Sequence, residues 1–414
     1  MEPAIHEQDI LIVGAGIAGL TTALGLHRLG IRSLVLESSD GLRTTGFALT
    51  MWTNAWIALD AVGIGDAVRA KSVTIQDFEV GSLDSSMTSP VQVHGTDFKL
   101  GKFESRCVRR TDLLEILERE LPQGTIRYSS KIVAIDESGS FKLVHLADGS
   151  IFRTKALIGC DGVNSMVAKW LGLQSPVNAA RSAIRGFVVY PEGHGFEPKL
   201  YAYFGGGVRY GFVPCEEKSI YWFCTFTPSL FKYDENERDP LKMKQFVMSK
   251  MGNAQKRVME LVERTELDCI SCAPLKFRTP WNILFGNIVK NNVCVAGDAL
   301  HPMTPDLGQG GCSAVEDGVV LARCLGEALS SSTVKEGDWD CVKMMKGLEK
   351  YAKERRWRSF SLVSIAYVVG FLQESDNKVV SFFRKRFLSR FTVEPFVRMA
   401  DFDCGKLIAT SSLT

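Results

Sequence analysis

The sequence predicts an α/β protein in which a parallel sheet with flanking helices is interleaved along the chain with a second domain built on an antiparallel sheet. Three observations predict this class: a glycine turn between a strand and a helix at 14–19, a strand-rich stretch at 183–226, and a second strand-glycine-helix order after Val293. The chain has 414 residues, more than the roughly 250 to 300 that one hydrophobic core holds, so at least two packed units are expected.

Composition and charge exclude several classes of protein. Apolar residues make up 45% of the chain and charged residues 23%, which is ordinary globular composition and argues against a long disordered tract. Lys and Arg number 49 against 47 Asp and Glu, so the net charge of +2 provides no global field for nucleic acid. Eleven cysteines at irregular spacing, most of them in apolar runs, predict reduced thiols of a cytoplasmic protein and no metal site. The oligomeric state stays open.

The first element is a strand at 9–13, which leads into Gly14-Ala15-Gly16-Ile17-Ala18-Gly19 and then a helix that ends at Gly30. A second strand at 33–37 ends in Glu37, about 20 residues after the glycines. Glycine lets the backbone approach a pyrophosphate, the helix N-terminus points free N–H groups at it, and the acid binds ribose hydroxyls. We therefore predict one tightly bound dinucleotide, either NAD or FAD, held by Gly14, Gly16, Gly19 and Glu37. The alternative is a glycine turn used only for helix-sheet packing.

The middle of the chain is rich in predicted strands. Two strands at 126–135 and 141–146 form a hairpin, and a buried strand at 156–159 returns to the first sheet. Four further strands separated by Gly and Pro indicate the antiparallel sheet, at 183–190, 200–204, 208–213 and 219–226. Helices are expected at 239–251 and 254–263, before the strand at 293–296 re-enters the first sheet.

Domain boundaries follow from this order. Residues 1–75, 103–178 and 280–340 form the dinucleotide-binding domain, 76–102 and 179–279 form the substrate domain, and 341–414 form a region of C-terminal helices. The apolar stretch at 360–372 is shorter than the roughly 20 residues of a membrane-spanning helix, so a buried helix is predicted there. The basic, aromatic sequence at 382–391 leaves two alternatives: peripheral contact with a membrane surface, or packing against the first domain with its charges in solvent.

Two more motifs follow predicted strands and precede predicted helices. One is Gly297-Asp298-Ala299-Leu300-His301-Pro302, continued by Pro305-Asp306-Leu307-Gly308-Gln309-Gly310-Gly311 and a helix that carries Glu316 and Asp317. Its acid can accept from a ribose, and glycines that enter a helix offer N–H donors to a developing anion. The other is Cys160-Asp161-Gly162-Val163-Asn164-Ser165. Each motif alone also fits an N-capped turn, and for the isolated His301 a structural role in the loop is favoured over catalysis or metal binding.

In this order the three motifs resemble the FAD-dependent aromatic-ring hydroxylases, the single-component flavoprotein monooxygenases with the p-hydroxybenzoate hydroxylase fold. The chain is most similar to the plant salicylate-hydroxylase-like branch, judged by Arg43-Thr44-Thr45-Gly46 and the run 297–317. The resemblance implies a Rossmann-like FAD-binding domain whose further cofactor contacts are Arg43, Arg110, Asp161, Asp298, Leu307 and Gly311. It also implies that the backbone of Pro305, Gly308, Gly310 and Gly311 faces the reactive ring of the flavin.

The resemblance implies the reaction as well. NADPH or NADH would reduce the flavin, oxygen would add at C4a to give a hydroperoxide, and one oxygen atom would enter a small, electron-rich, aromatic or heteroaromatic substrate. A basic residue that the family often carries three positions after the serine of the Asp161 motif is Ala168 here, which leaves the choice of nicotinamide open. Two alternative functions also stay open: a reductase or dehydrogenase of the same fold, and an FAD-binding interaction protein with little turnover.

Overall fold

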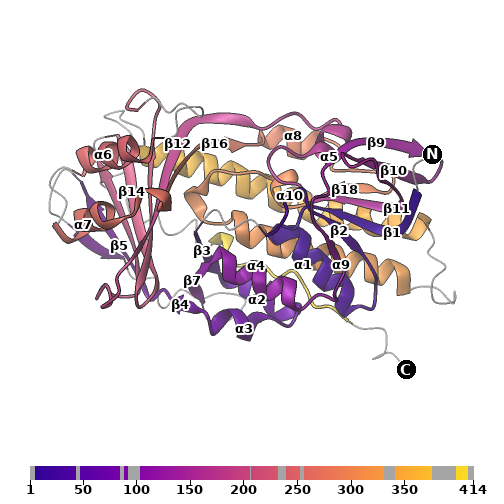
Figure 1. The fold of residues 1–414 in the computed structure, drawn as a ribbon, viewed down its shortest axis with the longest axis horizontal. Helices are drawn as coiled ribbons and strands as arrows, with labels where there is room; N and C mark the ends of the chain where they lie inside the picture. The colour runs from indigo at the N-terminus through magenta and orange to yellow at the C-terminus, as the bar shows by residue number, and fades with distance from the viewer. Residues whose placement is uncertain are drawn as a thin grey trace.

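The computed structural model describes residues 5–42, 47–83, 88–91, 103–205, 207–231, 239–251, 256–330, 341–374 and 398–408. Arg43 and the basic sequence at 382–391 therefore lie outside the described residues. The molecule is elongated, with the helix-covered parallel sheet at one end of the long axis and a second sheet, antiparallel except for one parallel pair of strands, at the other (Figure 1). The α/β class with two interleaved sheets is confirmed.

The first sheet has a parallel centre and antiparallel additions. Its strands are, in spatial order, β17 (Val289–Lys290), β18 (Val293–Val295), β11 (Ile151–Gly159), β1 (Ile5–Val13), β2 (Leu34–Leu36) and β8 (Ile126–Arg127), with β9 (Ile132–Ser138) and β10 (Phe141–Leu146) attached to β11. The prediction of a single strand at 126–135 is wrong. The strand is interrupted at Ser129, which has a φ of +51°, so β8 pairs with β2 while β9 pairs with β10.

Helices cover this sheet and extend the domain beyond it. They are α1 (Ile17–Arg28), α2 (Thr53–Ala61), α3 (Gly65–Arg69), α4 (Arg110–Arg119), α5 (Met166–Trp170), α8 (Pro280–Phe285), α9 (Gly310–Ser330) and α10 (Cys341–Glu374). A small antiparallel sheet of β3 (Ala48–Trp52), β7 (Ser105–Arg109) and β4 (Ser72–Thr74) packs against β14 (Val208–Glu216) of the second sheet through a cluster that includes Ala48, Cys107 and Val213. Contact between the two sheets is thus apolar at this point.

The second sheet has seven strands. Their spatial order is β16 (Ile270–Phe277), β12 (Val177–Val189), β15 (Ser219–Phe226), β14 (Val208–Glu216), β13 (Lys199–Gly205), β5 (Asp77–Ser82) and β6 (Thr88–Val91). The four strands predicted between 183 and 226 are confirmed as β12 to β15. Helices α6 (Pro240–Lys250) and α7 (Lys256–Arg264) cover one face of the sheet, which we call the outer face, and the inner face points toward the first sheet (Figure 1).

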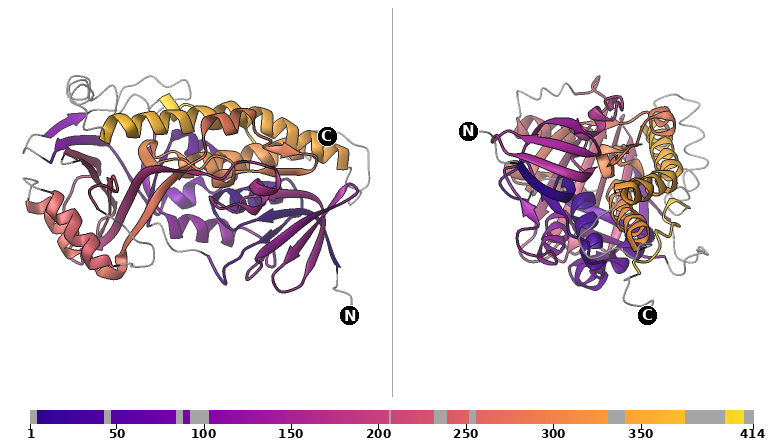
Figure 2. Two further views of the ribbon diagram at one scale, coloured as in Figure 1. Left: turned by 90° about the horizontal axis from the view of Figure 1, so that it is seen from above. Right: turned by 90° about the vertical axis from the view of Figure 1, so that its right-hand side faces the viewer.

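The helix α10 has 34 residues and runs along the long axis past both sheets (Figure 2). The prediction of a buried helix at 360–372 holds for only one side, because Leu362 and Ala366 are buried while Val368 and Phe371 are exposed. Within the described residues, no helix is both long enough and apolar enough to cross a membrane.

Candidate active site

The helices α1 and α9 run parallel, which places their N-termini at the same edge of the first sheet. A Cβ placed on Gly318 would lie 2.7 Å from the Cβ of Thr21, and one placed on Gly25 would lie 2.7 Å from the Cβ of Ala322. The step from Thr21 to Gly25 on α1 is thus matched by the step from Gly318 to Ala322 on α9, so the two helices run in the same direction. Only glycine at these contacts lets the helices approach so closely. Two sets of free N–H groups and two positive helix ends therefore point toward one place, where an anion is favoured.

The three glycines of the first turn have different surroundings. Gly14 has a φ of +100°, and a Cβ there would lie 2.5 Å from the carbonyl oxygen of Cys160. A Cβ on Gly19 would lie 1.9 Å from the carbonyl oxygen of Gly14, so the fold itself requires both of these glycines. Gly16 has no positive φ, and a Cβ there would meet no atom of the described residues within 4 Å. The described part of the chain therefore leaves the space beside Gly16 open, as a bound pyrophosphate requires.

Glu37 ties the end of β2 to this turn. One carboxylate oxygen, Oε2, accepts the backbone N–H of Ala15 at 2.8 Å, and the other, Oε1, accepts the N–H of Ser39 at 2.9 Å. The side chain is almost fully buried. Oε1 also accepts the hydroxyl of Ser38 at 3.1 Å, so the carboxylate is held in place beside the turn, and its bond to ribose hydroxyls stays a prediction.

Asp298 and Arg110, which are far apart in the sequence, come together in the structure. The Asp298 side chain is exposed to solvent, yet desolvation by the surrounding protein raises the pKa of its carboxyl. The charges of His301 and Arg110 act in the opposite direction on that pKa. The Asp298 side chain is thus open to solvent, while protein groups that include Arg110 are near enough for their charges to act on it, and we call this place the Asp298 recess.

The loop at 304–311 connects this recess to the second sheet. Pro305–Leu307 form one 3-10 turn, and Gly308 follows with a φ of +60° while its carbonyl accepts the indole N–H of Trp52 at 3.1 Å. Among the described residues, a Cβ on Gly310 would have only Met303 within 4 Å, at 3.9 Å. Two buried polar atoms of this loop, Thr304 Oγ1 and Gln309 Nε2, have no hydrogen-bond partner in the part of the protein that the structure describes. Buried polar groups are normally hydrogen-bonded, so these atoms fit a loop that contacts a ligand.

The carboxylate of Asp161 is directed at a helix. Oδ2 accepts the backbone N–H of Met166 at 2.7 Å, and Oδ1 accepts the hydroxyl of Ser165 at 2.5 Å. These bonds satisfy donors at the N-terminus of α5, which is the role of a capping residue. The capped-turn interpretation of this motif thus has direct support, and cofactor contact by Asp161 stays a prediction.

His301 is fully buried in a network of charges. Its Nε2 lies 2.6 Å from Asp317 Oδ2, which also accepts the backbone N–H of Gly297 at 2.7 Å, and Arg355 Nε donates to Asp317 Oδ1 at 2.5 Å. Burial acts to raise the pKa of Asp317, but the charges of His301 and Arg355 outweigh it and lower the value to about 2. The network holds the start of the Gly297 motif, which supports a structural role for His301. In the described part of the chain no three His, Cys, Asp or Glu side chains form a group that could hold a metal ion.

A second buried ion cluster joins the 304–311 loop to the inner face of the second sheet. Asp306 is fully buried and accepts from Arg181 of β12 at 2.7 Å and from Arg209 of β14 at 3.0 Å. Gly370 of α10 covers the pair, since a Cβ there would lie 2.3 Å from Asp306 Oδ2. Sequence reasoning missed both arginines and Arg355. The sequence did carry a signal for such residues, which is a charged residue inside an otherwise apolar strand. Arg209, which follows Val208 in β14, is an example.

Half-buried aromatic side chains lie on the inner face beside this cluster. Strand register puts Arg185 opposite Phe223 and Phe187 opposite Tyr221, so the four side chains share that face. The ring of Phe223 lies 5.3 Å from the guanidinium of Arg209, which fixes its position relative to Asp306. Burial raises the pKa of the Tyr221 hydroxyl, and Arg185 opposes this effect. Phe187 and Tyr221 pack on Phe47 and on the apolar cluster of the small sheet. They and Phe223 nevertheless keep part of their surface accessible, unlike the fully buried Trp222 and Phe226 of the outer face.

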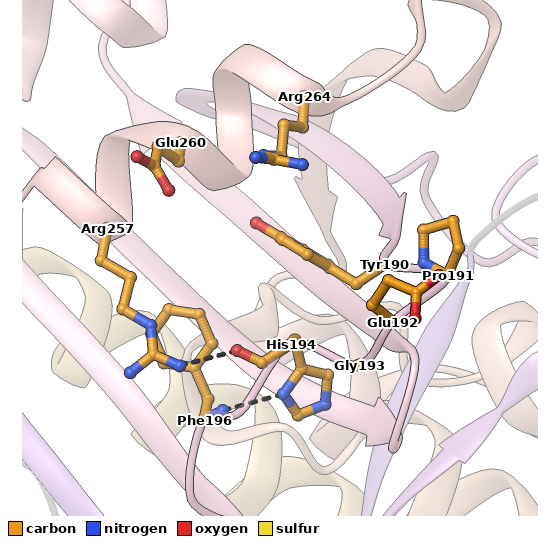
Figure 3. Close-up of a pocket in the computed structure, with 9 residues that line it drawn as sticks. All are labelled: Tyr190, Pro191, Glu192, Gly193, His194, Phe196, Arg257, Glu260 and Arg264. Carbon is orange, nitrogen blue, oxygen red and sulfur yellow. Dashed lines mark hydrogen bonds between the residues drawn. The ribbon is translucent and has the colours of Figure 1, made fainter.

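A separate hollow of about 300 Å³ lies on the outer side of the second sheet (Figure 3). It is lined by Tyr190, Pro191, Glu192, Gly193, His194, Phe196, Arg257, Glu260 and Arg264. Both ring nitrogens of His194 are engaged, Nε2 with the carbonyl of Glu216 at 2.7 Å and Nδ1 with the N–H of Phe196 at 3.0 Å. None of the predicted site residues lines this hollow.

Comparison with known proteins identifies the class. A family model described as FAD binding domain matches residues 7–338. The chain therefore belongs to the FAD-dependent monooxygenases of the aromatic-ring hydroxylase family, and its cofactor is FAD.

Individual relatives refine this picture. Monooxygenase 2 of Arabidopsis thaliana is 50% identical over 405 residues, which cover 97% of this chain and 98% of the relative. An FAD-dependent urate hydroxylase of Mycolicibacterium vanbaalenii is 26% identical over 320 residues, 75% of this chain and 78% of that protein. Klebsiella pneumoniae HpxO complexed with FAD and uric acid has a TM-score of 0.81 at 21% identity, covering 96% of each chain. A salicylate hydroxylase substrate complex has a TM-score of 0.73 at 19% identity, covering 96% of this chain and 98% of that one. The solved structures share the fold.

The recess provides a direct test of FAD binding. We expect Asp298→Ala to weaken FAD binding about tenfold to hundredfold, because losing a charge-assisted hydrogen bond costs about 1.5 to 3 kcal/mol. Titration of the apoprotein with FAD, followed by flavin fluorescence, measures the change. Asp268→Ala, at an exposed carboxylate of the other domain, is the matched control. An unchanged dissociation constant for Asp298→Ala would exclude the proposed contact.

Proposed function

We propose that this protein uses NADPH or NADH to reduce its FAD and then inserts one atom of molecular oxygen into a small, electron-rich aromatic or heteroaromatic molecule. The observation that carries the substrate class is the open aromatic surface of Phe187, Tyr221 and Phe223, on the sheet face that Asp306 ties to the 304–311 loop. Aromatic walls with a few fixed polar groups are typical of sites for flat organic molecules.

FAD supplies hydride acceptance and oxygen activation when it is bound, and the protein supplies binding, orientation and shielding from water. Gly16 and the α1 N-terminus would hold the pyrophosphate, Glu37 the ribose, and Asp298 with Arg110 the middle of the cofactor. The N-terminus of α9, where Gly310 and Gly311 leave the backbone accessible, would stabilise negative charge on the flavin ring. Pro305 to Gly308 would place the ring beneath the aromatic side chains of the inner face.

Arg185 and Tyr221 are the polar groups that this arrangement offers to a substrate. The guanidinium can donate to a carboxylate, phenolate or ring carbonyl, and the neutral phenol can donate or accept one bond. Uric acid and salicylate, which the structural relatives HpxO and salicylate hydroxylase suggest as trial compounds, are both flat molecules with such oxygens.

Labelled oxygen distinguishes this function from its alternatives. A panel of phenolic, indolic and purine compounds is first screened for stimulation of NADPH oxidation, and the responding compound is then converted under labelled molecular oxygen. We expect one labelled atom in the product and no product under anaerobic conditions. An unlabelled product that forms equally well without oxygen would identify a reductase or dehydrogenase, and tight FAD with no stimulated NADPH oxidation across the panel would favour an interaction protein.

A further inference from the structure

Between Phe360 and Leu372, α10 is apolar on all sides apart from Ser361 and Ser364, although only one side is packed against the described part of the protein. Leu362, Ala366 and Val369 are buried, and the last two belong to the core cluster of the first domain. Val368 and Phe371 lie on the opposite side and are exposed. A surface helix normally turns charged and polar residues to water, and a helix that is apolar all round is normally covered all round. The exposed side of α10 therefore has the composition of a contact surface.

Aromatic rings continue this surface onto α8. Trp281 is 65% exposed, Phe285 76% and Trp357 of α10 62%. Their rings form a connected series: Trp281 lies 6.1 Å from Phe285 and 6.0 Å from Phe360, which lies 5.5 Å from Trp357. We call these four residues the aromatic ridge. Single exposed apolar residues are ordinary, but a contiguous group of large rings marks an interaction site.

The ridge is rigid. Arg356 Nη1 donates to the carbonyl oxygens of Ile283, Leu284 and Gly286 at 2.7, 2.9 and 2.9 Å, which are the last carbonyls of α8 and the residue after it. This cation at the C-terminus of a short helix fastens α8 to α10. The rings are thus presented by two elements that are locked together, so little side-chain or backbone ordering is needed for them to bind a surface.

The charges beside the ridge are positive. Lys346, Lys350 and Lys353 precede Trp357 at spacings of four, three and four residues, so they share its side of the helix. Lys350 pairs with Glu327, and among the described residues neither Lys346 nor Lys353 has a carboxylate partner. A partner for this side of the molecule is therefore apolar and negatively charged.

We propose that the aromatic ridge and the lysines of α10 dock this protein on an anionic lipid surface. Tryptophan and phenylalanine rings enter the boundary between headgroups and acyl chains, and lysines beside them interact with acidic headgroups. A second copy of the chain is a poorer occupant, because a two-fold contact through the ridge would set the same lysines against each other. The docking surface is on the outer side of α10. It is therefore a different surface from the cofactor site at Gly16 and Asp298 in the first domain.

Vesicle co-sedimentation of the FAD-loaded protein tests the proposal. We expect binding to vesicles that contain phosphatidylserine, much weaker binding to pure phosphatidylcholine, and a decrease with salt. Phe285→Ser and Trp357→Ser should each weaken binding at least about tenfold, the loss that follows from one buried ring. Lys346→Glu combined with Lys353→Glu should weaken it as well. Leu241→Ser, an exposed apolar residue of α6 that is 49% exposed, should bind like the wild type.

Further measurements check that the variants fold and identify other occupants of the ridge. Retained FAD content and unchanged circular dichroism show that each variant is folded. Absence of wild-type binding to anionic vesicles overturns the proposal. A concentration-dependent dimer that Trp357→Ser abolishes would assign the ridge to a second copy, and tryptophan fluorescence already shielded from acrylamide without vesicles would assign it to another segment of the chain. A blue shift of that fluorescence on adding anionic vesicles, lost in Trp357→Ser, supports docking.

Discussion

Replacing Gly16 with valine should abolish FAD binding and leave the chain folded. The described part of the fold makes no demand on this position, since none of its atoms lies within 4 Å of a Cβ placed there and the backbone is not in the left-handed region. The branched side chain would occupy the space in which the pyrophosphate meets the N-terminus of α1. We expect the purified variant to lack flavin absorbance after gel filtration and to show wild-type secondary structure by circular dichroism.

The other glycines of the same turn provide the control. Gly19→Val places a side chain where a Cβ alone would be 1.9 Å from the carbonyl oxygen of Gly14, so this variant should be destabilised or fail to fold. Added FAD should raise the melting temperature of the wild type and have no effect on Gly16→Val, because a ligand stabilises only the state that binds it. Normal FAD occupancy in Gly16→Val would mean that the cofactor does not approach this turn.

Much of the fold was accessible from the sequence because its signals are local. The turn at 14–19, the acid at the end of β2 and the four strands between 183 and 226 are marked by periodicity and by glycine, which depend on neighbouring residues. The break between β8 and β9 was missed because nothing in the residues around Ser129 requires a positive φ. Ser129 adopts this conformation because the strand before it, β8, pairs with β2, and the strand after it, β9, pairs with β10.

The candidate site was predicted in part for a similar reason. Backbone positions such as Gly16 and Gly310 belong to motifs, and the open space beside them agrees with a ligand contact. Asp306 belongs to a motif as well, but its partners Arg181 and Arg209 are brought to it by tertiary structure alone. Arg355 is likewise a charged residue within the apolar side of a helix, and only the packing of α10 on α9 reveals Asp317 as its partner.

The ion cluster at Asp306 predicts the largest change in stability. Asp306→Asn keeps the shape of the side chain and removes its charge, which leaves the guanidinium groups of Arg181 and Arg209 buried without a carboxylate from this position. Loss of one member of a buried ion pair costs about 3 to 5 kcal/mol. We therefore expect denaturant unfolding to show a decrease of that size in the free energy of unfolding. Glu120→Gln, which breaks the exposed pair with Arg28, should cost less than about 1 kcal/mol.

A combined variant separates the charge effect from the packing of the cluster. If Asp306→Leu is made together with Arg181→Met and Arg209→Met, no buried charge is left uncompensated, and apolar replacement of a whole buried cluster is often neutral or stabilising. The triple variant should therefore recover most of the stability that Asp306→Asn loses. Its FAD-dependent turnover should stay impaired, because the bonds that place the 304–311 loop against the inner face are gone. Wild-type stability in Asp306→Asn would show that the two arginines are solvated in the folded protein and that the cluster does not hold the loop.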